Sequence, residues 1–440
     1  LLFGVGGRIP FALQEWFGLN QQDFWLRGLA GVLLVHTMTM YPYFYLTVRA
    51  ALLNADVSVE EAAASLGAGS FRVWTRIILP MLTPAFVAAS LLVFMSSMSS
   101  YTAPLLFQYT DVMTQQIVNA KVSGDLRLSA VISTTLAVIS IIFLIIIRST
   151  EMRASYRTTS KGGGRRRDVQ TSWPVKVLVA VITIPISLFL ISPLIMIFVQ
   201  SITAKGGWLV SVMPTQYTGD WYRAMFSQEG FWTPVLNSLL LSLVAVGLAL
   251  LLGVGAAYIL SRYRFRGKLL LDVMVMLPWA LPGTVVAINM ITAFSKPNPF
   301  AGGQVMVGTF WILAVAYFVR FNPLIFRSSA ASLAQMDPNL EDAARSLGAS
   351  WFMTFRRVVL PLMMPGILAG GLLAFVDGVG EFVASVLIYT PNWIPLSIAI
   401  NNEMYQGNYG IGAVYGMIQV VLILIAVSVS QRPNSKAQAF

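Results

Sequence analysis

The sequence contains no cysteine and a single histidine, His36. Disulfide bonds and thiolate metal sites are therefore excluded, as is any site that needs two imidazoles from this chain. We expect His36 to make a polar contact between helices rather than to bind a ligand. Charge is also scarce, because Asp, Glu, Lys and Arg make up 11% of the 440 residues, against about 25% in soluble domains. No G-x-x-x-x-G-K-[ST] string occurs, so the sequence has no P-loop for the phosphates of ATP.

What the sequence has in quantity is apolar residues. Hydrophobic residues make up 57% of the chain and the mean hydropathy is +0.73, so we expect a membrane protein surrounded by lipid bilayer. The formal net charge of +11 does not indicate binding to nucleic acid, because many of the basic residues gather in segments 148–176 and 262–268, between apolar runs. Basic segments between spans are typical of cytoplasmic loops.

Apolar runs long enough to cross a bilayer, about 20 residues each, recur along the chain. Alternation between the two sides puts segments 53–79, 149–174, 261–268 and 334–360 in the cytoplasm, and segments 1–26, 106–127, 201–234, 293–307 and 389–408 outside. The predicted fold class is an all-α, polytopic membrane protein. Its nine expected spans lie near residues 27–50, 80–105, 128–148, 175–200, 235–260, 269–292, 308–330, 361–388 and 409–430.

One segment of the sequence occurs twice. Residues Glu60–Pro84 and Glu341–Pro365 are identical at 12 of 25 positions, at a constant offset of 281 without gaps. Other positions agree at the same offset, among them Pro42 with Pro323. The sequence therefore predicts two tandem, parallel units related by a pseudo-twofold axis along the membrane normal.

The expected domain order follows from this repeat. Residues 1–148 form a first unit with three spans, residues 149–174 a basic cytoplasmic linker, residues 175–430 a second unit with six spans, and residues 431–440 a cytoplasmic tail. Gly, Ser and Arg dominate the linker, which favours a flexible tether. At the offset of 281, Leu1 corresponds to Pro282, whereas the second unit begins near Trp173. We therefore expect about 108 residues with three further spans before Leu1, and twelve spans in the intact chain.

The repeated loop has the sequence of two short helices. Ser58 can cap the first helix, with Glu61 reaching back to it, and Gly67 can close that helix in the left-handed conformation. A second amphipathic stretch follows, and Pro80 begins the next span. A short helix with exposed acids between two spans predicts a rigid projection that binds a soluble partner. The matching positions in the second copy are Asp337 or Asn339, Gly348 and Pro361.

This pattern closely resembles the EAA signature of bacterial ABC importer permeases of the type I, MetI-like class, which reads Glu-Ala-Ala, three residues, Gly, nine residues, Ile-x-Leu-Pro. The first copy fits at every position. The second copy has Asp342 in place of the glutamate and Val358 in place of the isoleucine. The resemblance covers nearly the whole chain, and it implies that each unit has the MetI-like helical fold.

In that class the loop is the coupling helix, which fits a cleft on an ATP-binding subunit. The resemblance implies two ATP-binding ABC subunits on the cytoplasmic side and a periplasmic solute-binding protein as partners, in the bacterial inner membrane. ATP and Mg would bind to those subunits, so we expect no catalytic residue, metal site or cofactor in this chain. The residues expected to couple the chain to them are Glu60, Glu61, Ala62, Ala63, Gly67, Leu79 and Pro80 in the first copy, and Glu341, Asp342, Ala343, Ala344, Gly348, Leu360 and Pro361 in the second.

Two acidic residues fall near the end of one predicted span. Acids inside a span cost roughly 2.5–3.5 kcal/mol each on insertion scales and indicate function. Asp377 and Glu381 lie four residues apart, so on one helix they share a face, and at the offset of 281 they match Ser96 and Ser100, next to Tyr101. We expect these five residues to line the translocation path. An interhelical polar contact is the alternative interpretation of the acids.

The solute is expected from charge and from the resemblance. Carboxylates suit hard cations, and the fused layout with the stretches GEFVASVLIYTP and LEDAARSLGAS is similar to the ferric-iron branch of the class, which works with a periplasmic iron-binding protein. We therefore expect ferric iron, moved by alternating access coupled to ATP hydrolysis. Thiamine, phosphonates and sugar phosphates are the alternatives, because fused permeases carry them too.

Two other classes of protein fit the sequence less well. A secondary transporter driven by an ion gradient would explain the acids within a span, but not the twin capped helices on the cytoplasmic side. An intramembrane enzyme is disfavoured by the lone histidine, the lack of cysteine and the absence of a Ser/His/Asp or di-metal pattern.

Overall fold

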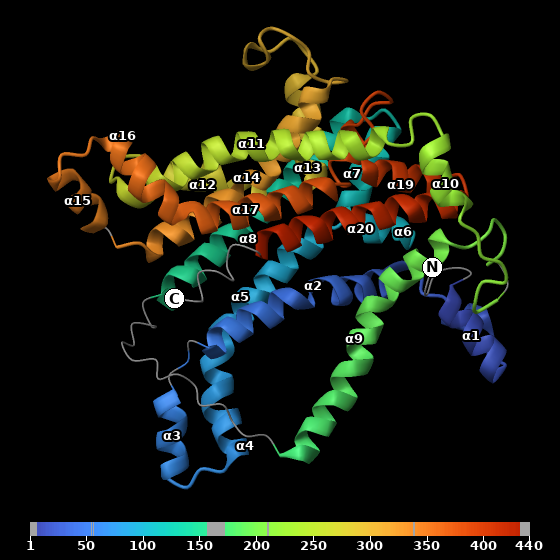
Figure 1. The fold of residues 1–440 in the computed structure, drawn as a ribbon, viewed down its shortest axis with the longest axis horizontal. Helices are drawn as coiled ribbons and strands as arrows, with labels where there is room; N and C mark the ends of the chain where they lie inside the picture. Colours follow the sequence, from blue (N-terminus) through green and yellow to red (C-terminus); the bar gives the residue numbers. More distant parts are fainter. Residues whose placement is uncertain are drawn as a thin grey trace. The chain divides into compact units, whose positions relative to one another are not determined.

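The computed structural model describes residues 7–53, 55, 57–155, 172–208, 211–337 and 339–431. Within these residues the chain is built from helices, and the β pairing is confined to three isolated bridges. The all-α prediction is therefore confirmed, as the ribbon in Figure 1 shows. Most of the predicted linker, residues 156–171, and nearly all of the tail, residues 432–440, lie outside the described residues.

The chain divides into two compact units. Unit 1 consists of residues 1–119 and 134–195, and unit 2 of residues 120–133 and 196–440. Helix α8 (Leu126–Ser155) continues past residue 148, where the sequence places the start of the linker. The boundaries of the tandem repeat and its pseudo-twofold axis stay predictions.

Unit 1 is centred on two long helices, α2 (Gly28–Leu53) and α5 (Leu79–Met98), which pack together. The Oγ atom of Ser97 lies 3.0 Å from Nδ1 of His36, so His36 joins α5 to α2 and its predicted role as an interhelical polar residue is confirmed. The remaining elements are α1 (Arg8–Phe17), η1 (Gln21–Phe24), α3 (Val57–Ser65), α4 (Ser70–Val73), η2 (Trp74–Ile78), α6 (Thr102–Leu106) and most of α7 (Met113–Val122), of α8 and of α9 (Trp173–Ser201).

Unit 2 has its core between three long helices, α11 (Thr233–Arg262), α14 (Phe310–Gln335) and α17 (Leu360–Val379). Apolar side chains between them, such as Leu241, Ile325 and Met363, have no exposed surface. The remaining elements are α10 (Asp220–Ser227), α12 (Lys268–Ala280), α13 (Gly283–Phe294), η3 (Pro299–Ala301), α15 (Asn339–Ser346), α16 (Trp351–Thr354), η4 (Phe355–Val359), α18 (Ser385–Ile388), α19 (Leu396–Tyr405) and α20 (Tyr409–Gln431).

Glycines let α17 approach α14 closely. A Cβ atom at Gly366 would lie 2.1 Å from Oγ of Ser332, and one at Gly370 would lie 2.8 Å from Cα of Ile325. Small residues four apart are typical of tightly packed membrane helices, because they bring the two backbones together.

Seven of the described helices are long and apolar enough to cross a membrane. Helices α12 and α13 make an eighth candidate if they are taken together, although the chain bends by 111° between them. Pro282 stands at this break, and the residue before a proline is disfavoured in a helical conformation; Leu281 is extended there. The remaining predicted span, near residues 27–50, corresponds to α2, a helix of 26 residues that is not among these seven. The seven helices are Phe71–Met98, Leu126–Ile146, Trp173–Ser201, Thr233–Arg262, Phe310–Gln335, Trp351–Val379 and Tyr409–Val429.

The span after each repeated loop begins earlier than predicted. The helix is continuous from Phe71 to Met98, so Pro80 lies inside it rather than at its start. A proline has no N–H to donate, and its ring crowds the carbonyl four residues back. The chain accommodates this with a π-helical turn, in which the N–H of Leu79 bonds the carbonyl of Trp74, five residues back. The second copy has the same turn, from Leu360 to Phe355, before Pro361.

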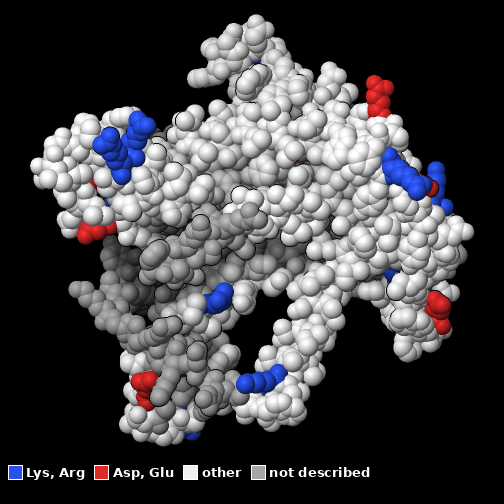
Figure 2. Space-filling model, viewed as in Figure 1, with Lys and Arg blue, Asp and Glu red and all other residues white. Residues whose placement is uncertain are grey.

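Charged side chains are rare along the sides of the long helices. Figure 2 shows that on the face of unit 2 in view, the blue and red atoms gather toward the ends of the helices, and the middle is uncharged. Helix α9 is mostly apolar, with Lys176 near its start as its one charged residue, and Ser201 is its one buried residue. Such surfaces suit contact with lipid rather than water.

Candidate functional site

The repeated loop of unit 2 consists of helices α15 and α16. Oδ1 of Asp337 accepts a hydrogen bond of 2.9 Å from the N–H of Asn339, the first residue of α15, so the prediction of an aspartate cap is confirmed. Gly348 closes the helix at a φ of 83°, as predicted. Ser350 caps α16 by accepting from the N–H of Met353 at 3.3 Å. Two caps and a left-handed glycine therefore fix the shape of this loop.

The loop of unit 1 repeats this geometry in part. Gly67 also has a φ of 83°, which confirms the predicted helix end. Helix α3 begins at Val57, so Ser58 is its second residue rather than its cap. Position 56, which would be the cap, lies outside the described residues. Glu61 is exposed and Glu60 is half-buried.

Both loops present large apolar side chains to the outside. Leu347 is 89% exposed and Phe352 is 62% exposed, and their counterparts at the offset of 281, Leu66 and Phe71, are 88% and 82% exposed. Side chains of this kind at matching positions form an apolar patch on each loop. Exposed apolar patches next to charged residues are typical of protein–protein contacts.

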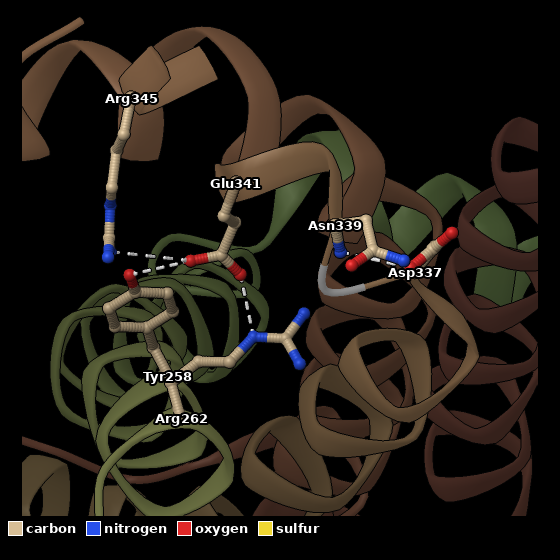
Figure 3. A network of polar contacts seen from close by, with 6 residues as sticks. All are labelled: Tyr258, Arg262, Asp337, Asn339, Glu341 and Arg345. Atoms are coloured by element: carbon tan, nitrogen blue, oxygen red, sulfur yellow. Dashed lines mark hydrogen bonds and ion pairs between the residues drawn. The ribbon is translucent and has the colours of Figure 1, made fainter. Parts of the chain in front are cut away.

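Two neighbouring acids on α15 point in different directions. Asp342 is exposed, whereas Glu341 is 5% exposed. Figure 3 shows the carboxylate of Glu341 between side chains of α11 and α15. Nε of Arg262 donates to Oε1 at 2.6 Å, and the hydroxyl of Tyr258 donates to Oε2 at 3.1 Å. Arg345 is a weaker ion-pair partner at 3.9 Å.

The acids of the predicted translocation path also differ from one another. Helix α17 ends at Val379, so Glu381 lies beyond the helix and does not continue the face on which Asp377 lies. Asp377 is exposed and Glu381 is 6% exposed. The glycine-rich sequence around residues 378–380 explains the early end, because glycine is a poor helix former. The expectation that the two acids share a helix face is therefore wrong.

Glu381 is held by several partners within unit 2. Its carboxylate forms an ion pair with Arg320 of α14, and its Oε1 accepts from the N–H of Ala384 at 2.7 Å. Its backbone carbonyl accepts from Ser397 at 2.6 Å. The guanidinium of Arg320 also lies close to the first turn of α13, because a Cβ atom at Gly283 would lie 2.9 Å from its Cζ. Glu381 is thus a paired, buried carboxylate.

The path residues predicted in unit 1 are polar groups at the end of α5. Ser96 and Ser100 are half-buried. Tyr101 is 3% exposed and precedes helix α6. The hydroxyl of Thr114 donates to the carbonyl of Ser100 at 2.8 Å. The assignment of Ser96, Ser100, Tyr101, Asp377 and Glu381 to a path stays a prediction.

The basic partners of these acids were not predicted from the sequence. Arg320 lies inside a predicted span, and a buried cation in an apolar run should have been matched with a buried acid. Arg262 was counted with the basic segment 262–268, and Tyr258 lies in an apolar run without a distinguishing pattern. Among the described residues, no group of three or more His, Asp or Glu side chains is placed to hold a metal ion.

A family model named "Binding-protein-dependent transport system inner membrane component" matches residues 8–155 and 249–432. The chain belongs to this family. The two matched segments include the two repeated loops, one in each segment. The chain is therefore the membrane permease component of an ABC importer, and a multi-pass protein of the inner membrane.

Two of the curated relatives match almost the whole chain, and a third matches about half of it. ABC transporter permease protein y4fN of Sinorhizobium fredii is 28% identical over 96% of this chain and 74% of its own length. Ferric transport system permease protein FbpB of Actinobacillus pleuropneumoniae is 28% identical over 97% of this chain and 61% of its own length. A third relative, in Salmonella paratyphi A, is named as permease protein PhnV of a 2-aminoethylphosphonate transport system; it is 31% identical over 56% of this chain and 89% of its own length.

Proposed function

We propose that the two repeated loops bind separate ATP-binding subunits, whose ATP hydrolysis drives transport by alternating access. The support is the geometry that recurs at the offset of 281: a left-handed glycine, an exposed leucine and an exposed phenylalanine in each loop. A docking surface that occurs twice suits two copies of one ATP-binding subunit, or two related ones. A solute-binding protein on the outer side would deliver the solute, in keeping with the family's description.

Ferric iron is the solute that we propose. The relative FbpB, whose name assigns it to ferric transport, aligns with 97% of this chain. Glu381 pairs with the half-buried Arg320, and Asp377 lies four residues earlier in the chain, so carboxylates outnumber guanidinium groups near the end of α17. The exposed carboxylate of Asp377 suits transient contact with a hard cation, because such cations prefer oxygen ligands.

A phosphonate is the second candidate. The relative PhnV is more similar in sequence, at 31% identity, but over 56% of this chain. Arg320 beside the first turn of α13 also favours an anion, because the N-terminal end of a helix carries partial positive charge. The ion pair of Arg320 with Glu381 disfavours binding of an anion there, because the charge of the guanidinium is already neutralised.

Reconstituted vesicles can test the proposal. The chain is purified with the ATP-binding subunit encoded beside its gene, and the solute-binding protein is added outside the vesicles, loaded with radiolabelled ferric iron or with labelled 2-aminoethylphosphonate. We expect uptake of iron that requires ATP and persists when ion gradients are collapsed. Uptake of the phosphonate alone would replace the proposed solute, and uptake without the ATP-binding subunit would refute the whole proposal.

A further inference from the structure

We infer that Glu341 is a positioning residue that anchors helix α15 to the end of helix α11, and that it does not itself bind the ATP-binding subunit. This inference rests on the proposed docking role of the loop. The two neighbouring acids of the repeated loop then have different roles. Glu341 transmits movement inside the chain, and Asp342 contacts the ATP-binding subunit.

The contacts of Glu341 account for both of its oxygen atoms. Oε1 accepts from Arg262 and Oε2 accepts from Tyr258, and both donors belong to the last two turns of α11. With 5% of its surface exposed, the side chain has no free face for a partner protein. Successive residues of a helix point about 100° apart, so Asp342 is turned outward while Glu341 is turned inward, as its exposure shows.

Aromatic rings extend the same anchor to the rest of the loop. The ring of Tyr258 lies 5.1 Å from Phe355 and 6.1 Å from Trp351, both at steep angles, and Trp351 stacks on Phe355 at 5.6 Å. Aromatic pairs at such distances add attraction beyond the burial of their surface. Tyr258 thus binds α15 through its hydroxyl, and α16 and the π turn through its ring.

The anchor gives the loop a second mechanical connection to the spans. Through the chain alone, α15 is joined to α14 by residues 336–338 and to α16 by residues 347–350. The bonds from Glu341 to Arg262 and Tyr258 join it directly to α11 as well, and α11 packs along both α14 and α17. A push on α15 therefore reaches the core of unit 2 through α11 without first bending the connecting loops.

The charge on Glu341 is needed for this connection. Hydrogen bonds to a charged group are stronger than neutral ones. A neutral amide at this position also has an NH2 group in place of one carboxylate oxygen, so only one of the two present donors would still meet an acceptor atom. Glu341→Gln keeps the size of the side chain and removes the ion pair, so it should loosen α15 without removing the outward surface of the loop.

The first test measures binding and transport in the reconstituted importer. With Glu341→Gln we expect the ATP-binding subunit to copurify at the wild-type level, while solute transported per ATP falls roughly tenfold, since a hydrogen bond to a charged group is worth more than a tenfold change in an equilibrium. The matched control is Asp342→Asn, one residue away on the same helix, which should instead reduce copurification. Tyr258→Phe removes one hydroxyl and should reproduce the loss of coupling more mildly.

The second test needs no partner protein. Because the sequence has no cysteine, spin labels can be attached at Ser261→Cys on α11 and Ser346→Cys on α15. We expect one narrow distance distribution, which becomes broad with Glu341→Gln and stays narrow with Asp342→Asn. A narrow distribution in both variants, or normal transport per ATP with Glu341→Gln, would overturn the anchor. If the ATP-binding subunit did not copurify with the wild-type chain, the docking proposal would be refuted. The anchor would not be refuted by that result, because the distance measurement needs no partner.

Discussion

The packing of α17 on α14 predicts the sign and the size of the change in stability that a substitution at Gly370 would cause. A Cβ atom at Gly370 would lie 2.8 Å from Cα of Ile325, whereas carbon atoms pack at about 3.5–4.0 Å. Gly370→Ala therefore requires the two backbones to separate by about 1 Å, and over-packing of this kind costs about 1–3 kcal/mol. Alanine regains about 0.5–1 kcal/mol through its higher helix propensity. We expect a net loss of about 0–2.5 kcal/mol.

The control is the same substitution in open space. A Cβ atom at Gly255 on α11 would meet nothing within 4 Å, so Gly255→Ala should stabilise the protein by about 0.5–1 kcal/mol. The two variants share the same change of helix propensity, and the difference between them isolates the contact with α14. Thermal unfolding of the purified chain in detergent measures both. If Gly370→Ala unfolds at the same temperature as Gly255→Ala, or above it, the close contact between α14 and α17 is refuted.

Three further predictions concern the remaining polar and loop residues. Arg320→Met should cost about 3–5 kcal/mol, because it leaves the carboxylate of Glu381 buried without its partner; adding Glu381→Gln should restore most of the thermal stability, and additive losses would contradict the ion pair. Gly67→Pro should abolish copurification of the ATP-binding subunit while the chain remains in the membrane, because proline cannot adopt the φ of 83° found there; a wild-type yield of the subunit would count against docking at this loop. Asp377→Asn should lower ATP-dependent uptake of ferric iron several-fold at an equal amount of protein, and unchanged uptake would remove Asp377 from the path.

Local features of the sequence predicted local features of the structure. The left-handed glycines at positions 67 and 348 and the cap at Asp337 depend on neighbours within a few residues, and all three were found. The long apolar runs likewise predicted helices, because a backbone in lipid must satisfy its hydrogen bonds internally. The repeat at an offset of 281 located both loops, because similar short sequences favour the same helix ends and turns.

Features that depend on distant residues were not predicted. Glu341 was expected to contact a partner, but its burial depends on Arg262 and Tyr258, about 80 residues earlier in the chain. The expected helix face of Asp377 and Glu381 assumed that α17 continues to Glu381, two residues beyond its observed end at Val379. The spacing of residues in the sequence predicts the direction of a side chain only within one continuous helix. It does not predict which other helix packs against that side chain.

The two π turns have a consequence for how the length of these segments can vary. Each turn holds one residue more than an α-helical turn, and each helical residue adds about 100° of rotation. Deleting one residue from Phe355–Val359 would let an ordinary helix form, and it would swing α16 and α15 about a quarter of a circle around the axis of the span. The apolar patch of this loop would then point in a different direction from the one it has in the structure. The number of residues between Gly348 and Pro361 therefore sets the direction in which the loop of α15 and α16 projects. Single deletions there should be less tolerated than substitutions.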